Sequence, residues 1–441
     1  VSLYFANDSS THQYSLIPIY TILIFGVGKS STVLIDYLIR EAEQRQWKII
    51  VADADLQVAK AKIRNSPFAE AMQLDIVNDE QRSKLIESAA VVISMMPPGM
   101  HYLVAKDCVH YKKHLLTASY LDDKIKTLQH QIESSNILFL CEMGLDPGID
   151  HMSAMQIIDD IKANGGKITS FKSHCGGLVA PESDNNPWHY KISWNPRNVV
   201  LAGNSGAIFK QNGHNISIAY KDLFDKNNRV NINGIGALAY YANRDSLSYI
   251  PIYHLQEAVT FMRTTLRYAG YFDGWDAIVQ AGLTSEKDKV AHNITFAEWS
   301  KSILPFITKE NKDQLSFLGL FENDIIPGHI QSSADTLQYL LEKKLAMQPQ
   351  DKDMIVMLHE FEYLENGKTK YLQSCLLVKG ENNLQTAMAK TVGLPLGIAA
   401  KLILTGKLKL TGLHIPTLKE IYNPVLQQLE IEGIKFIEST M

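Results

Sequence analysis

The chain has 441 residues, enough for two or three domains, and its formal net charge of −4 argues against the basic surface of a nucleic-acid-binding protein. Its four cysteines, Cys108, Cys141, Cys175 and Cys375, lack the spacing of a zinc site or a disulfide framework, so we expect no metal and a reducing cytoplasm. Residues 1–16 carry no secretory pattern, and lysines interrupt the most apolar stretch, residues 387–404, so no membrane association is expected.

The first patterned segment is a short apolar run, Thr21–Phe25, which predicts a buried strand. Gly26 and Gly28 follow, and residues 30–39 have apolar side chains at helical spacing. A strand, a glycine turn and a helix together hold a dinucleotide pyrophosphate, because glycines allow close approach and the helix N-terminus offers free N–H groups. The predicted cofactor contacts here are Gly26, Gly28, Lys29, Ser30 and Ser31. Ser31 replaces the usual third glycine, so a tight turn without a ligand is the alternative.

Five more short apolar runs alternate with helical patterns up to about residue 140. They lie at residues 48–51, 72–74, 91–94, 115–117 and 137–140. Six strands alternating with helices predict an α/β fold with a doubly wound parallel sheet, a Rossmann domain that we place at residues 17–148. Ligands of such sheets bind outside the carboxyl ends of the strands.

Asp53 ends the second of these strands, at a suitable distance after the glycines to accept hydrogen bonds from an adenosine ribose. A carboxylate there would repel a 2′-phosphate, so Asp53 favours NAD over NADP. The alternative is that Asp53 caps a helix beginning near Leu56.

Other polar residues follow the fifth and sixth strands at the same edge of the sheet. Ser119 and Tyr120 come after the fifth strand, and Asp146 comes after the sixth. Pro147 and Gly148 suit the central positions of a type II turn, which would aim Asp146 back towards that edge.

The pattern changes after residue 149. Lys167–Cys175 alternates like a strand with one buried face, and residues 354–378 predict a hairpin that turns at Asn366-Gly367. We therefore predict an α+β substrate-binding and dimerisation domain with a mixed sheet at residues 149–385, followed by a helical C-terminal segment at residues 386–441.

Several motifs together resemble the saccharopine reductase family, the glutamate-forming saccharopine dehydrogenases of lysine metabolism. They are Leu145–His151, His174–Leu178 with Pro181-Glu182, Asn186-Pro187, Tyr190–Trp194, Ala242–Ser246, Thr265–Tyr268 and Thr391–Gly393 with Pro395. The resemblance implies a homodimer whose C-terminal segment returns to the Rossmann domain. It also implies NADPH as the usual cofactor, against the preference suggested by Asp53.

The resemblance further implies the site residues. Substrate contacts would be made by Ser119, Tyr120, Asp146, Arg244, Thr265, Leu266 and Arg267. Additional cofactor contacts would be made by Cys175, Pro196, Arg197 and Asn198. The substrates would be saccharopine, glutamate and 2-aminoadipate 6-semialdehyde.

Imine reduction needs a hydride from the cofactor, a proton for nitrogen and groups that hold carboxylates. Tyr120 and Asp146 are the candidate proton donors, although Asp146 could instead bind a substrate ammonium and Tyr120 could be a packed aromatic residue. Cys175 could donate a weak hydrogen bond near the nicotinamide or fill space as a small buried residue.

Arg244 and Arg267 suit the carboxylates of saccharopine, with ordinary salt bridges as the alternative. Two other functions fit the same scaffold. One is an imine reductase acting on a different aldehyde and amine, such as a polyamine precursor. The other is a dinucleotide-binding protein without catalytic activity.

Overall fold

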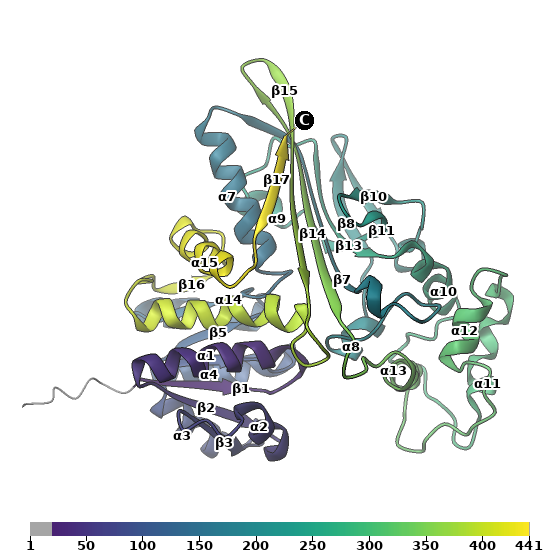
Figure 1. The fold of residues 1–441 in the computed structure, drawn as a ribbon, viewed down its shortest axis with the longest axis horizontal. Coiled ribbons are helices and arrows are strands. Elements are labelled where there is room, and N and C mark those ends of the chain that lie inside the picture. The colour runs from purple at the N-terminus through teal and green to yellow at the C-terminus, as the bar shows by residue number, and fades with distance from the viewer. Residues whose placement is uncertain (1–19, 441) are drawn as a thin grey trace, which may run out of the picture.

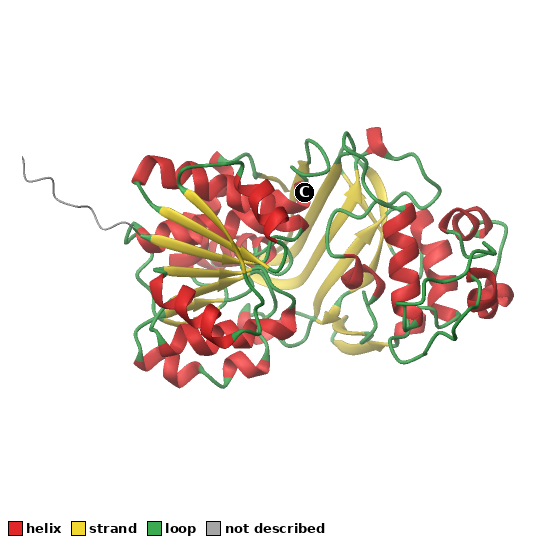
Figure 2. Ribbon diagram, turned by 90° about the horizontal axis from the view of Figure 1, so that it is seen from below, coloured by secondary structure: helices red, strands yellow, loops and turns green. Residues whose placement is uncertain are grey.

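A computed structural model of the chain describes residues 20–440 (Figure 1), so the polar segment at residues 1–16 lies outside the described residues. The chain forms a seven-stranded parallel sheet beside a ten-stranded mixed sheet. Figure 2 shows the parallel sheet with helices on both faces and the second sheet next to it. The predicted fold class is confirmed.

The parallel sheet has the strand order β3-β2-β1-β4-β5-β6-β16. Its strands are β1 (Thr21–Phe25), β2 (Lys48–Asp53), β3 (Ala69–Gln73), β4 (Val91–Ser94), β5 (His114–Thr117), β6 (Leu138–Leu140) and β16 (Gly412–His414). Its helices are α1 (Thr32–Arg45), α2 (Leu56–Ile63), α3 (Asp79–Ser88), α4 (His101–His110), α5 (Asp123–Lys126) and α6 (Gln129–Ser134). The strand order reverses between β1 and β4, and in a doubly wound sheet that crevice is where ligands bind.

In the second sheet β7 pairs in parallel with β13 and antiparallel with β14, which makes the sheet mixed as predicted. Its strands are β7 (Lys167–Val179), β8 (Ala207–Gln211), β9 (His214–Ile218), β10 (Arg229–Ile232), β11 (Gly236–Ala242), β12 (Arg244–Asp245), β13 (Thr260–Arg267), β14 (Asp353–Glu365), β15 (Lys368–Lys379) and β17 (Phe436–Thr440). The predicted hairpin is β14–β15, and Asn366 and Gly367 form its turn with positive φ angles of 51° and 74°.

The remaining helices of the second half are α7 (Ile149–Ala163), α8 (Pro196–Val200), α9 (Tyr249–Ile252), α10 (Ala269–Gln280), α11 (Phe296–Trp299), α12 (Lys312–Leu318) and α13 (Ser333–Lys344). In Figure 1, α10 to α12 lie at the end of the molecule far from the parallel sheet, while α7 lies beside the second sheet and contacts β7.

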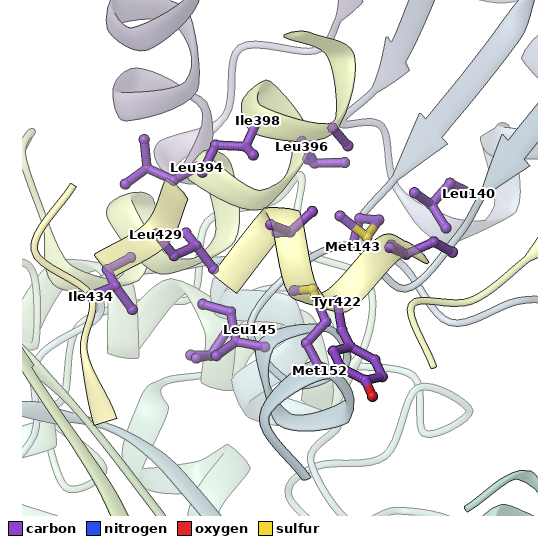
Figure 3. Close-up of a cluster of buried hydrophobic side chains, with 14 of the residues drawn as sticks. Leu140, Met143, Leu145, Met152, Leu394, Leu396, Ile398, Tyr422, Leu429 and Ile434 are labelled. Atoms are coloured by element: carbon purple, nitrogen blue, oxygen red, sulfur yellow. The ribbon is translucent and has the colours of Figure 1, made fainter. Parts of the chain in front are cut away.

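The C-terminal segment lies against the first half of the chain. Helix α14 (Ala387–Leu404) packs along α1, and α15 (Lys419–Ile431) contacts both α7 and α14. Figure 3 shows the shared cluster, in which side chains of α14 and α15 meet Met143, Leu145 and Met152. This cluster supports the loop after β6 from behind, and that loop carries Asp146. The domain boundaries given above stay predictions.

Helix α14 has the length and apolar composition that a membrane span requires, but 72% of it is buried inside the fold. Apolar helices of this kind also form the cores of globular domains.

Candidate active site

The glycine turn occupies the crevice between β1 and β4. Gly26 has a φ of 92°, and a side chain there would come within 2.9 Å of the Met95 carbonyl oxygen. A side chain on Gly28 would instead meet nothing within 4 Å. The turn is thus closed against the sheet and open on its outer side, where the backbone leads through Lys29–Ser31 into α1. These residues fit a dinucleotide pyrophosphate.

Two residues of this turn make further contacts. Ser31, in place of a third glycine, donates its hydroxyl to the Gly28 carbonyl oxygen at 2.9 Å, which braces the turn. The Lys29 ammonium group donates to the Ile192 carbonyl oxygen at 3.3 Å and so links the turn to the second half of the chain.

Asp53 lies beside the same turn. Its carboxylate accepts hydrogen bonds from the Val27 N–H at 2.8 Å and the Asp55 N–H at 2.9 Å. The helix cap is Asp55, whose side chain accepts from the N–H groups of Gln57 and Val58. The alternative interpretation of Asp53 as the cap is therefore wrong, and its carboxylate is fixed at the end of β2.

Asp146, Tyr120 and Arg263 form the centre of the site, between the carboxyl edge of the parallel sheet and β13. The Tyr120 hydroxyl donates to the Asp146 carboxylate at 3.3 Å, and one Arg263 nitrogen donates to the same carboxylate oxygen at 2.5 Å. That nitrogen also donates to Asp150 at 2.8 Å. The exposed Arg244 guanidinium lies 5.3 Å from the centre of the Tyr120 ring.

Asp146 does not reach this place through the predicted type II turn. Gly148 has a φ of 145° and a ψ of −84°, far from the φ of about 80° that such a turn needs. A side chain on Gly148 would lie 2.1 Å from the Gly144 carbonyl oxygen, so the loop closes tightly on itself. The peptide bond between Asp146 and Pro147 is cis.

The two carboxylates respond oppositely to their surroundings. Burial raises the pKa of Asp146; the Arg263 charge lowers it by less than burial raises it, and the nearby charge of Asp150 adds a smaller upward shift. Burial also acts on Asp150, but the charges of His151 and Arg263 and the Gly148 N–H leave its pKa lowered. A pair of carboxyl groups with opposed shifts is typical of sites where one carries the proton and the other stays ionised.

A buried network supports this pair from below. His151 contacts the Glu142 carboxylate at 2.8 Å through one ring nitrogen and the Tyr253 hydroxyl at 2.6 Å through the other. Tyr249 also donates to Glu142, at 3.1 Å, and its ring stacks on His151. The end of the first half of the chain is thereby tied to the segment before β13.

Two family models match the chain over most of its length. One, described as the saccharopine dehydrogenase NADP binding domain, matches residues 22–140, and the other, described as the saccharopine dehydrogenase C-terminal domain, matches residues 144–434. The chain belongs to the saccharopine dehydrogenase family. The resemblance inferred from the sequence motifs is confirmed.

Members of the saccharopine dehydrogenase family match the chain in sequence and in structure. The saccharopine dehydrogenase [NADP(+), L-glutamate-forming] of Schizosaccharomyces pombe is 32% identical, with 95% of this chain and 98% of that protein covered. The apo structure of the L-glutamate-forming enzyme from Saccharomyces cerevisiae has 31% identity and a TM-score of 0.84, covering 96% of this chain and 100% of that one.

The alpha-aminoadipic semialdehyde synthase of Arabidopsis thaliana is 35% identical over 95% of this chain, but the match covers 44% of that protein. The synthase of Bos taurus is covered to 47%. The chain therefore spans about half the length of these relatives.

The face of β13 that looks onto the centre carries Arg263, Thr265 and Arg267, because strand side chains alternate. Cys175 is paired with Thr265 on the neighbouring β7, and burial raises the pKa of its thiol well above the ordinary value. Arg267 is buried with its guanidinium 5.2 Å from the centre of the Tyr190 ring.

Leu266 points the other way. Its side chain is fully buried in a separate apolar cluster with Leu178 and Val356, and the substrate contact expected of this residue stays a prediction. The predicted cofactor segment Pro196-Arg197-Asn198 begins α8, where Arg197 forms ion pairs with Glu286 and Asp335 in the helical end. Its contact with the cofactor stays a prediction.

Ser119 is held by a histidine that sequence reasoning missed. His101 on α4 contacts the Ser119 hydroxyl at 2.8 Å and the Ser94 hydroxyl at 2.8 Å through its two ring nitrogens. Burial lowers the pKa of His101 to about 4, so it is neutral near pH 7. It links the ends of β4 and β5 beside Tyr120.

Arg263, Asp150 and Glu142 were also missed. One signal was available for Arg263, because it shares the parity of Thr265 and Arg267 on the same predicted strand. Its partners Asp146 and Asp150 stand more than 110 residues earlier, at a distance that local patterns do not bridge.

Proposed function

We propose that the chain is an NAD(P)-dependent saccharopine dehydrogenase of the L-glutamate-forming type, acting in lysine metabolism. The observation that carries the proposal is the Tyr120–Asp146–Arg263 centre, which lies at the carboxyl edge of a Rossmann sheet in a member of the saccharopine dehydrogenase family. The substrates are small amino acids: saccharopine on one side, glutamate and 2-aminoadipate 6-semialdehyde on the other.

The bound dinucleotide supplies or accepts the hydride at the reacting carbon. In the reductive direction Asp146 gives its proton to the imine nitrogen as that carbon gains the hydride, and the product is the secondary amine of saccharopine. In the oxidative direction Asp146 takes the nitrogen proton, the C=N bond forms, and water then releases the semialdehyde and glutamate. The raised pKa of Asp146 suits a group that must hold this proton near neutral pH.

The other residues bind and orient. Arg244, exposed at the edge of the centre, and Arg267, buried between tyrosine rings, are the proposed partners of substrate carboxylates. Tyr120 holds Asp146 through its hydroxyl, and Ser119 is presented by His101. Burial raises the pKa of Cys175 well above its ordinary value, so it remains a thiol that can serve this site as a weak hydrogen-bond donor.

The direct test follows nicotinamide absorbance while purified protein is offered saccharopine with NAD and then with NADP. We expect an absorbance rise with saccharopine, lost by at least 100-fold in Asp146→Asn and kept in Asp160→Asn, an exposed position on α7. No turnover with either cofactor, despite dinucleotide binding, would favour a non-catalytic binding protein. Turnover with a polyamine-derived imine alone would favour the related reductase.

We propose further that the cofactor is NAD, although the relatives named above are described as NADP(+)-dependent. Asp53 is anchored by two backbone N–H groups at the end of β2, and Ala54 and Asp55 follow it without a basic residue. The nearby Lys62 donates to the Gly28 carbonyl oxygen and to the Ser31 and Thr32 hydroxyls. Because the Lys62 amine is already bonded to these three oxygens, a 2′-phosphate on the adenosine ribose would meet the Asp53 carboxylate.

The cofactor proposal is tested with Asp53→Ala. We expect weaker NADH binding, by roughly tenfold for the loss of a charge-assisted hydrogen bond, and a relative gain for NADPH. Steady-state kinetics with both cofactors measure the ratio. An unchanged ratio in the variant would remove the assignment of Asp53 to the ribose.

We also propose a cytoplasmic homodimer. The four cysteines are free thiols, which suits a reducing compartment. Tyr371, Leu377 and Ile437 are 47%, 44% and 73% exposed. They share one face of β15 and β17 by the pairing register, and that face would suit a second copy of the chain.

A further inference from the structure

A single guanidinium joins the two acidic groups of the centre. The Arg263 nitrogen that donates to Asp146 also donates to Asp150, and it lies 3.4 Å from the Tyr120 hydroxyl. The side chains of Arg263 and Asp150 are 2% and 1% exposed, whereas Asp146 is 13% exposed. Of the trio formed by Arg263, Asp146 and Asp150, Asp146 is therefore the residue that substrate can reach, whereas Asp150 is buried behind it.

Asp150 is held as a fixed negative charge. Its other carboxylate oxygen accepts the Gly148 N–H at 2.6 Å, and the His151 ring nitrogen lies 3.6 Å from the oxygen that faces Arg263. His151 is in turn bonded to Glu142 and Tyr253. An acid with this many partners, all buried, has little freedom to move or to exchange its proton with solvent.

The other charged and titratable groups around the trio come from several elements. Tyr120 follows β5, Arg244 is on β12, Tyr249 and Tyr253 lie in and after α9, Cys175 is on β7, and Glu142 and His151 lie below. The Arg263 guanidinium is 4.5 Å from the centre of the Tyr249 ring, so the arginine is confined from that side too.

We propose that Asp150 is a positioning residue that acts through Arg263 to set the proton affinity of Asp146. If Arg263 had Asp146 as its sole anionic partner, their attraction would favour the ionised carboxylate and make Asp146 a poor proton donor. Asp150 shares the cation and adds a second negative charge close by, and both effects favour the protonated form of Asp146. This inference rests on the proposed function, because it explains how Asp146 keeps the proton that imine reduction requires.

The test compares charge with shape at position 150. Asp150→Asn keeps the shape and removes the charge, so the pKa of Asp146 should fall by about 1 to 2 units and the pH profile of kcat/KM should move to acid by the same amount. Asp150→Glu keeps the charge and should give a profile within about half a unit of the wild type. Asp160→Asn, on the same helix, is the matched control and should leave the profile unchanged.

A second readout does not depend on turnover. Infrared difference titration follows the carboxylic acid band that disappears in Asp146→Asn, and its midpoint should lie above the ordinary aspartate value near 3.9 in the wild type and drop in Asp150→Asn. A purely structural role would lower kcat in Asp150→Asn without moving either midpoint, and that result would overturn the proposal. A wild-type midpoint at or below the ordinary value would overturn it as well, even if Asp150→Asn failed to fold.

The proposed function and the proposed role of Asp150 can be refuted independently of each other. Absence of saccharopine turnover in the wild type would remove the proposed function, while the infrared titration would still report whether Asp150 controls the proton on Asp146.

Discussion

Arg244 adopts a backbone conformation uncommon for residues other than glycine, with a φ of 51°. Its guanidinium is exposed and lies against Tyr120. In this region an arginine costs on the order of 1–3 kcal/mol, which suggests that the side chain is held there for binding.

We expect Arg244→Ala to raise KM for saccharopine by roughly 10- to 100-fold, the loss of one charge-assisted bond to a carboxylate. The affinity for the dinucleotide should change little, and equilibrium titration of the cofactor measures this separately. Arg229→Ala is the control, since Arg229 is an exposed arginine on β10 with no role in the site. Loss of cofactor binding in Arg244→Ala would contradict the role given to Arg244.

The buried His101 makes the free energy of unfolding depend on pH. Burial lowers its pKa to about 4 in the folded state, whereas an unfolded histidine has a pKa of about 6.5. Between these values the unfolded state binds more protons, so stability rises with pH across this window and is lost as the pH falls from 6.5 towards 4. In total, His101 lowers the free energy of unfolding by roughly 3 kcal/mol as the pH falls through this window.

The prediction for His101→Gln is a shallower fall in the free energy of unfolding between pH 7 and pH 4.5. Denaturant titrations at several pH values measure it. Part of the dependence should remain, because burial also lowers the pKa of His359 to about 4. Identical slopes in wild type and variant would show that His101 does not titrate as described.

At the scale of single residues, the sequence identified the side chains that follow strands and missed those that act through long-range contacts. Tyr120 and Asp146 were found because parallel strands end at one edge of a sheet. Arg263 and His101 were missed because their partners are set by how β13 and α4 pack. Strand alternation separates the side chain of Leu266 from those of Thr265 and Arg267, a distinction that the motif match did not make.

Among the elements, the contact between α1 and α14 depends on glycine. A side chain on Gly393 would come within 2.9 Å of the Leu34 backbone nitrogen, and one on Gly397 would come within 2.7 Å of the Tyr37 ring. The two helices therefore approach more closely than ordinary side chains allow, and α14 in turn supports the apolar cluster behind Asp146 (Figure 3).

We expect Gly393→Ala to lower the free energy of unfolding by about 1–3 kcal/mol, despite the higher helix propensity of alanine, because backbone atoms of α1 cannot yield. Chemical denaturation measures the change. Gly328→Ala is the control, since a side chain there meets nothing within 4 Å. A stabilised Gly393→Ala variant would mean that the two helices separate easily.

The strands marked by an apolar run or by a clear turn signal were predicted, and β12 and β16 were not. The first six strands of the parallel sheet and the β14–β15 hairpin were found from apolar runs and the Asn366-Gly367 turn. The two-residue β12 is too short to show a pattern, and the three-residue β16 lacks the apolar run that identified the equally short β6. They exist because neighbouring strands present free backbone groups to them.

On the scale of the whole molecule, the exposed face of β15 and β17 yields the prediction about assembly. Light scattering after size exclusion should give twice the chain mass of 49.5 kDa for the wild type. Ile437→Asp should shift the protein towards the monomer, because a carboxylate would be buried at the contact. Glu438→Gln, the next position along β17, is the control. A monomeric wild type would contradict the assembly.

The seventh strand of the parallel sheet has a consequence for biosynthesis. β16 pairs with β6, yet the two are separated by more than 270 residues of chain. A ribosome that has finished the nucleotide-binding half therefore releases a sheet whose last edge stays open until nearly the entire polypeptide has emerged. During that interval the half-made protein offers a free strand edge to other chains, so chaperone dependence and cotranslational aggregation should be decided at this edge.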